Sequence, residues 1–179
     1  MALRSLYSKA RVYISLDHLW NILQPYGKCY TSKSTLDAFA KRLKQEGDIN
    51  WNLAFHPYPS PLTDPNFWND NVTNSDSTKQ VTMKNLSYLT NYVSSHFRSD
   101  VRILLSEQGF TSVSYGTTNE TLQAAAWAYA YYITEFNDKV DAFIMNRHVD
   151  HKQETSQGLY LGVWTNKKGN LEYADKKKQ

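Results

Sequence analysis

Four short apolar runs alternate along the chain with longer segments of helical periodicity. The runs cover residues 11–16, 49–55, 101–106 and 140–145 and are rich in Val, Ile, Leu and aromatic residues. Nearly continuous apolar runs of this length are typical of strands buried in a parallel sheet. Each run ends in side chains capable of chemistry, namely Asp17 and His18, His56 and Tyr58, Glu107, and Asn146, Arg147 and His148.

The segments between the runs predict three helices, at 34–47, 82–97 and 119–137. Each has apolar residues at helical spacing, and Asn119 is a good N-cap for the third. The resulting order, βαβαβαβ, predicts an α/β fold with a parallel sheet and helical crossovers.

Two architectures have this order, a doubly wound open sheet and a (β/α)8 barrel. The chain contains neither GxGxxG nor GxxxxGK[ST], which disfavours dinucleotide and P-loop sites. A barrel builds its site from all of its strand ends, and all four ends here carry polar residues. The pattern therefore favours part of a (β/α)8 TIM barrel.

Length limits how much of a barrel can form. A complete barrel takes about 250 residues, whereas this chain has 179 residues. We therefore expect a single domain, residues 1–179, that forms about half of a barrel. Residues 57–81, rich in Pro, Asn, Asp, Ser and Thr, predict a long loop over the barrel mouth, held there by Phe67 and Trp68.

Composition disfavours several other classes of protein. The net charge is +3, with basic and acidic residues interspersed, so a nucleic-acid partner is not expected. A single cysteine, Cys29, excludes an internal disulfide and a CxxC metal site. No run of about 18 apolar residues or signal peptide is found, so no membrane partner is expected. No cofactor is indicated.

The strand-end residues suggest hydrolysis of glycosidic bonds. A retaining glycosidase uses two carboxyl groups, one as acid/base and one as nucleophile, about 5–5.5 Å apart. Glu107, at the end of an apolar run, is the candidate nucleophile, and Asp17 and Asp150 are possible second carboxylates. Aromatic residues near strand ends, such as Trp20 and Tyr58, suit a carbohydrate ligand. The alternative chemistry is a metal-dependent hydrolase with ligands from His56, His148, Asp150 and His151.

Four segments, VYISLDHLW, LAFHPYPSPLTDPNFW, ILLSEQGF and FIMNRHVDH, together resemble the C-terminal half of an uncharacterised bacterial family of glycosidase-like (β/α)8 barrels. The resemblance runs from about Tyr7 to Tyr173. That family is in turn similar to the clan A glycoside hydrolases. The resemblance implies a parent family that is secreted or on the cell surface of bacteria, although this chain itself gives no location.

The resemblance also implies roles for individual residues. The four runs become strands five to eight, and Glu107 falls at the nucleophile position. The remaining strand-end residues then line the substrate pocket; these are Asp17, His18, Trp20, His56, Tyr58, Asn146, Arg147 and His148. The acid/base Glu of the fourth strand has no counterpart in this chain.

Three functions remain open. The first is a fragment of a glycoside hydrolase with Glu107 as nucleophile. The second is a non-catalytic carbohydrate-binding or assembly module, and the third is the metal-dependent hydrolase. Because the first and last strands of half a barrel would be open edges, we also expect pairing with a complementary half-barrel or with a second copy of the chain.

Overall fold

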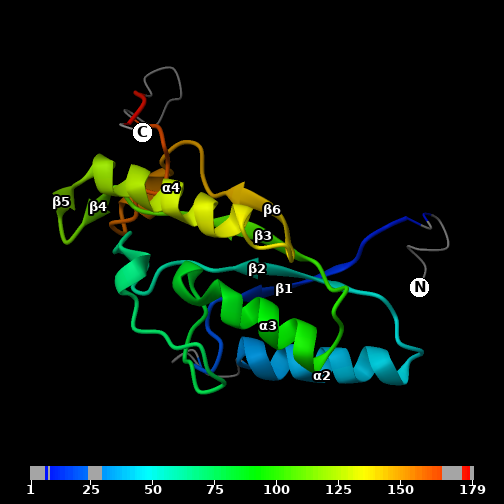
Figure 1. Cartoon of the computed structure of the whole chain (residues 1–179). Helices are drawn as coiled ribbons and strands as arrows, with labels where there is room; N and C mark the ends of the chain where they lie inside the picture. Colours follow the sequence, from blue (N-terminus) through cyan, green and yellow to red (C-terminus); the bar gives the residue numbers. More distant parts are fainter. Residues whose placement is uncertain (1–6, 8, 24–29, 167–174, 178–179) are drawn as a thin grey trace.

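The centre of the fold is a four-stranded, fully parallel sheet. The structure, a computed structural model, describes residues 7, 9–23, 30–166 and 175–177. The strands are β1 (Tyr13–Asp17), β2 (Asn52–His56), β3 (Ile103–Gln108) and β6 (Val140–Met145). They lie in the order β1-β2-β3-β6 (Figure 1), and every neighbouring pair is parallel. The predicted α/β class with a parallel sheet is therefore confirmed.

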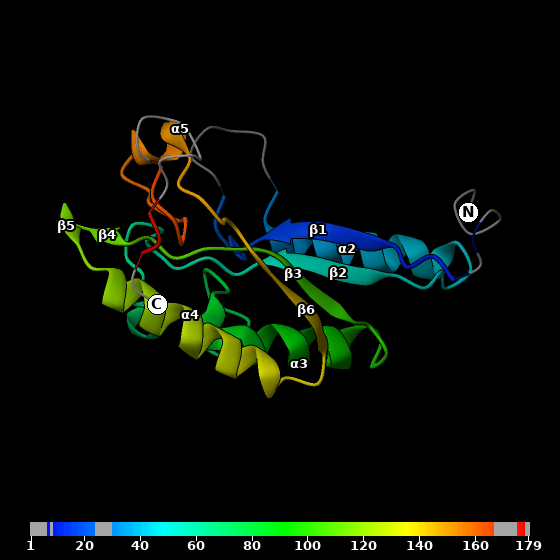
Figure 2. The same ribbon diagram turned by 90° about the horizontal axis from the view of Figure 1, so that it is seen from above.

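Three helices connect the strands. Helix α2 (Ser32–Gln45) follows β1, α3 (Leu86–His96) follows β2, and α4 (Glu120–Glu135) follows β3. All three pack against the same side of the sheet, because residues of each belong to one core cluster with β2 and β3. Figures 1 and 2 show the helices from two directions. No helix in the described parts of the chain is long and apolar enough to cross a membrane.

The hydrophobic core fills the space between the sheet and these helices. Leu53 and Phe55 of β2 and Ile103 and Leu105 of β3 are fully buried in one cluster with residues of all three helices. The alternate strand positions face the opposite side of the sheet. There Ser15, Ala142 and Ile144 are exposed, and Ile144 keeps 47% of its surface accessible. The sheet thus has one covered face and one open face.

The sheet is strongly curved toward its open face. Arg11 precedes β1 and Asp141 lies in β6, so the two residues belong to the opposite edges of the sheet. Nevertheless Arg11 Nη1 lies 2.8 Å from Asp141 Oδ2. Arg102 Nη2 binds the other oxygen of the same carboxylate, at 2.7 Å. Side chains at the two edges can meet only because the sheet between them is curved.

Local sequence signals set most helix starts. Asn119 caps α4 as predicted, since its Oδ1 accepts a hydrogen bond from the Leu122 N–H at 2.9 Å. Helix α2 begins two residues earlier than predicted, because Thr31 is the N-cap and accepts from the Ser34 N–H. Helix α3 follows a short 3-10 turn, η2 (Met83–Asn85), with Thr82 capping the turn.

The long loop at residues 57–81 is folded along the carboxyl ends of the strands. It contains a 3-10 turn, η1 (Phe67–Asn69), and Phe67 is fully buried. The Phe67 ring stacks on Tyr129 of α4, with centroids 5.2 Å apart. At its far end the Val81 N–H donates to the His18 carbonyl, which ties the loop to the end of β1.

A small hairpin after β3 was not predicted. It consists of β4 (Val113–Ser114) and β5 (Thr117–Thr118), which pair antiparallel. Its turn places Tyr115 at φ 49° and Gly116 at φ 77°. Positive φ suits glycine but is uncommon for tyrosine, so the sequence YG was a weak turn signal.

Candidate functional site

Glu107 lies at the carboxyl end of β3 and contacts residues from the two neighbouring strands. Its Oε1 accepts a hydrogen bond from Asn146 Nδ2 at 3.0 Å, just after β6. Its Oε2 lies 3.3 Å from Nδ1 of His56, the last residue of β2. The Glu107 side chain remains 42% exposed. This carboxylate is therefore oriented on both oxygens and still accessible.

Tyr58 joins the same group through Asn146. The Asn146 Nδ2 donates to the Tyr58 hydroxyl oxygen at 2.5 Å as well as to Glu107. Burial raises the pKa of Tyr58 far above its usual value, and the negative charge of Glu107 raises it further. The hydrogen bond from Asn146 acts in the opposite direction but does not cancel the rise. The phenol therefore stays protonated and can donate a hydrogen bond toward the Glu107 side of the site.

The end of β1 completes the group. His18 Nδ1 lies 2.6 Å from Asp17 Oδ1, and the His18 ring meets the Tyr58 ring edge-on at 6.4 Å. Burial acts to raise the pKa of Asp17, but the neighbouring His18 outweighs it and leaves that pKa below its usual value. We call these six residues the strand-end cluster; they are Asp17, His18, His56, Tyr58, Glu107 and Asn146.

Two local features bring Glu107 and Asn146 together. Leu105 pairs with Phe143, and Gln108 pairs with Met145. Between these two pairs β3 has one residue more than β6, so β3 carries a bulge around Glu107. Bulges change the alternation of side chains and are common beside active sites. Gly109 then lets the chains approach, because a Cβ there would lie 2.2 Å from the Asn146 carbonyl oxygen. A glycine directly after a strand end was the only sequence signal for this contact.

Three residues predicted to bind substrate lie outside the strand-end cluster. Trp20 is fully buried, packs edge-on against Tyr88 and Tyr92, and donates its indole N–H to the Tyr88 hydroxyl. Trp20 is thus a core residue. The prediction that it faces a ligand finds no support in this placement, because an apolar ring at a strand end can turn inward as readily as outward.

Arg147 and His148 contact residues beyond the end of β6, and among the described residues neither pairs with Glu107. Arg147 Nη2 pairs with Glu154 Oε1 at 2.6 Å, in the short helix α5 (Lys152–Thr155). The exposed His148 lies against the Trp164 ring at 6.1 Å. Neither Glu154 nor Trp164 could be predicted as a partner from sequence, since both lie beyond the predicted strand end.

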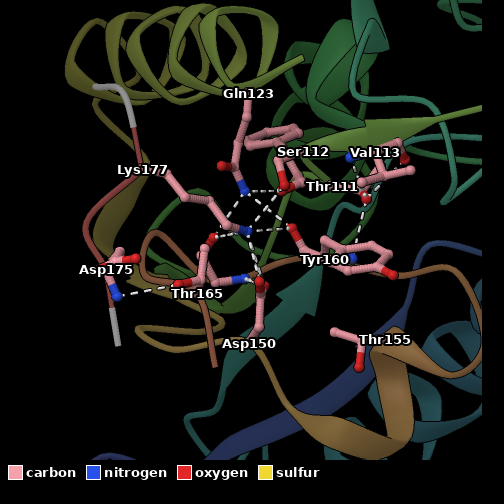
Figure 3. A network of polar contacts seen from close by, with 12 residues as sticks. Thr111, Ser112, Val113, Gln123, Asp150, Thr155, Tyr160, Thr165, Asp175 and Lys177 are labelled. Carbon is pink, nitrogen blue, oxygen red and sulfur yellow. Dashed lines mark hydrogen bonds and ion pairs between the residues drawn. The ribbon is translucent and has the colours of Figure 1, made fainter. Parts of the chain in front are cut away.

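Asp150, a candidate second carboxylate, is instead part of a buried ion pair. Its Oδ2 lies 2.8 Å from Lys177 Nζ, and the two side chains are only 3% and 2% exposed. Lys177 also donates to Ser112 Oγ and to the carbonyl of Gly162 (Figure 3). Gln123 of α4 donates to the same Gly162 carbonyl. We call this group, Ser112, Gln123, Asp150 and Lys177, the buried clamp.

The residues of the metal-site hypothesis do not come together. Among the described residues, no group of three His, Cys, Asp or Glu side chains is placed to hold a metal ion. His56 contacts Glu107 and Ser15, whereas Asp150 is neutralised by Lys177. Cys29 lies outside the described residues.

The fold and the strand-end cluster define an α/β protein with a polar site at the carboxyl edge of a parallel sheet. The chain belongs to a family of unknown function, DUF5722, whose family model matches residues 1–179. No curated protein and no solved structure matches the chain.

Proposed function

We propose that the chain is part of a glycoside hydrolase in which Glu107 is the nucleophile. The observation that carries this proposal is the placement of Glu107 in the strand-end cluster. Its carboxylate is half-exposed at the carboxyl end of a parallel strand and is oriented by Asn146 and His56. Ligand sites of parallel α/β folds lie at this edge, and a glycosidase nucleophile must be both ionised and reachable.

The neighbours of Glu107 suit this role. Asn146 fixes one carboxylate oxygen and leaves the other for attack on the anomeric carbon. His56 lies beside that second oxygen, and Tyr58 offers a phenol that stays protonated because of its raised pKa. Asp17 and His18 border the cluster and are placed to accept and donate hydrogen bonds to sugar hydroxyls.

In this proposal the sheet forms strands five to eight of a (β/α)8 barrel. Three features support it: the curvature that lets Arg11 reach Asp141, the three connecting helices on one side of the sheet, and the edge strands β1 and β6, beside which the described residues form no further strand. A complementary half-barrel, or a second copy of the chain, would pair with β1 and β6 and cover the open face. A complementary half-barrel would also supply the acid/base Glu, which the resemblance places on the fourth strand of the barrel.

A substrate with a good leaving group tests the role of Glu107 without the acid. In an aryl glycoside of dinitrophenol, the Glu107 oxygen bonds to the anomeric carbon while the bond to dinitrophenolate breaks. The phenolate leaves with the electron pair and needs no proton, and water then hydrolyses the glycosyl ester. Fluorination at the sugar C2 slows that second step, so the ester accumulates. We expect intact-protein and peptide mass spectrometry to find the sugar on Glu107.

The control is a carboxylate of similar exposure far from the site. Glu46, 48% exposed at the end of α2, pairs with Arg42. Glu107→Gln should abolish labelling, whereas Glu46→Gln should label as the parent chain does. Labelling that persists in Glu107→Gln would contradict the proposed nucleophile. Saturable sugar binding with no labelling would favour the non-catalytic carbohydrate-binding module, the second candidate supported by the accessible strand-end cluster.

A further inference from the structure

A second polar cavity lies beside the buried clamp. It encloses about 290 Å³, at the small end of the range of ligand sites, roughly 300–1,000 Å³. Ser112, Asp150 and Lys177 of the clamp form part of its wall (Figure 3). The rest comes from the β4–β5 hairpin, the start of α4, α5 and the chain after α5, with lining residues Val113, Thr118, Glu120, Thr155, Tyr160, Thr165 and Asn166.

The wall offers both donors and acceptors to a ligand. The Thr155 hydroxyl donates to the Lys152 carbonyl and keeps its lone pairs. Thr165 Oγ1 accepts from the Asp175 N–H, and its own proton has no acceptor among the described residues. Asn166 Oδ1 is buried with no hydrogen-bond partner among the described residues. A buried acceptor without a partner is costly unless a ligand or water satisfies it.

The charges of the wall argue against an anionic ligand. Lys177, the one cation among the described lining residues, is already paired with Asp150 and donates to Ser112 and two carbonyls. A phosphate or carboxylate group would therefore meet no unpaired cation among the described residues of the wall. Hydroxyl groups, which donate and accept at once, match the mixed wall, and Tyr160 and Val113 add apolar surface for ring C–H groups.

We propose that this cavity binds a single neutral sugar residue as an accessory site separate from Glu107. The inference goes beyond the proposed function, because it needs neither the nucleophile nor any reaction. The same two stretches of chain contribute to both sites, because Ser112 follows shortly after Glu107 and Asp150 follows shortly after Asn146. A sugar held here would anchor a longer carbohydrate at the same edge of the sheet.

The test is an NMR titration of the isotope-labelled full chain with glucose, galactose, mannose and xylose. At least one of these probes should give saturable shifts of the Thr118, Thr155 and Asn166 amides, with millimolar affinity. Thr155→Val removes one hydroxyl at nearly constant shape and should weaken binding about two- to tenfold, the effect of one hydrogen bond. Thr134→Val is the matched control, because its hydroxyl also donates within a helix, to the Ala130 carbonyl, but lies outside this cavity.

The outcomes separate this site from the strand-end cluster. Glu107→Gln should leave the titration unchanged while abolishing labelling in the experiment above. Shifts that disappear in Glu107→Gln, or equal affinities for Thr155→Val and Thr134→Val, would overturn the placement. The absence of saturable shifts with all four sugars would overturn the proposal, as would binding of inorganic phosphate at these amides. Neither result would affect the labelling of Glu107.

Discussion

Two carboxylates near the carboxyl edge of the sheet have opposite surroundings. Asp150 is 3% exposed and pairs with an equally buried ammonium group at 2.8 Å. Glu107 is 42% exposed, and its neighbours are an amide and an imidazole rather than a fixed cation. Asp150 thus has its charge neutralised within the fold, whereas Glu107 keeps a charge that a ligand can use.

The difference separates stability from function. A buried charge that loses its partner is strongly destabilising, so the clamp residues should be sensitive in folding experiments. An accessible carboxylate costs little to replace, so Glu107 should be sensitive in activity experiments. Four substitutions test this division.

The largest expected effect on folding is at Lys177. Lys177→Met leaves Asp150 charged and buried, which typically costs about 3–5 kcal/mol of unfolding free energy. The measurement is urea denaturation followed by circular dichroism. Lys176→Met is the control, because Lys176 is exposed and next in sequence, and it should change stability by less than about 0.5 kcal/mol. Equal effects of the two substitutions would mean that the buried pair of Lys177 and Asp150 adds nothing to stability beyond what an exposed lysine adds.

A smaller effect is expected at Asn146, this time on activity. Asn146→Ala removes one hydrogen bond to the Glu107 carboxylate and one to the Tyr58 hydroxyl. A hydrogen bond to a charged group contributes about 1.5–3 kcal/mol, so labelling at Glu107 should slow by roughly 10- to 100-fold. Because the acceptor Glu107 is half-exposed and can bind water instead, unfolding free energy should change by about 1 kcal/mol or less. A large stability loss with unchanged labelling would assign Asn146 to structure.

Asp70, in the loop at 57–81, is a third kind of carboxylate, because it is buried and forms no ion pair with another described residue. Burial raises its pKa to about 6, although hydrogen bonds from Thr82 and Ser60 and the charge of Lys84 oppose the rise. The folded state therefore favours the protonated form, and the penalty of ionisation is present above pH 6. It disappears as the pH falls from about 6 to the ordinary value of 3.8.

Asp70→Asn should consequently stabilise the chain above pH 7, by about 1–3 kcal/mol. The gain should vanish at pH 4, where Asp70 is protonated in the parent chain. Thermal unfolding of both proteins across this pH range measures the difference. A gain that does not depend on pH would mean that Asp70 ionises without penalty.

The smallest effect is expected at Asp17, with the opposite pH dependence. Its folded-state pKa is lowered, so its ionised form stabilises the fold above the ordinary value of 3.8 and loses this effect as the pH falls below it. Because the Asp17 side chain is 53% exposed, solvent screening limits the contribution to less than about 0.5 kcal/mol. Asp17→Asn should therefore lower stability slightly at pH 7 and not at pH 3. An effect as large as that of Lys177→Met would contradict the exposed placement.

The sequence predicted the elements of the fold better than the contacts of the site. The four strands and three helices follow from apolar runs and helical spacing, and Asn119 was recognised as a cap from its residue type. The β4–β5 hairpin was missed, because its two-residue strands are too short to show a pattern. The start of α2 was misplaced, because Ser32, Ser34 and Thr31 are all acceptable caps and only the backbone path selects one.

Within the site, residues at strand ends could be predicted and their partners could not. The carboxyl ends of parallel strands lie at one edge of the sheet. The residues at these ends include His56, Tyr58, Glu107 and Asn146. Trp20 stands at the same kind of position, yet the packing of Tyr88 and Tyr92 draws it into the core. Lys177 meets Ser112 from 65 positions away, and no local pattern marks such a pair.

The sequence by itself determined a parallel α/β sheet whose polar strand ends gather along one edge, because hydrophobic periodicity and chain direction are local properties. Only the tertiary structure decided which polar side chains are neutralised and buried and which stay accessible. Those outcomes depend on the curvature of the sheet, on the bulge before Gly109 and on a lysine near the end of the described chain. The distinction between Glu107 and Asp150 is therefore a property of packing, since both are acids that follow an apolar run.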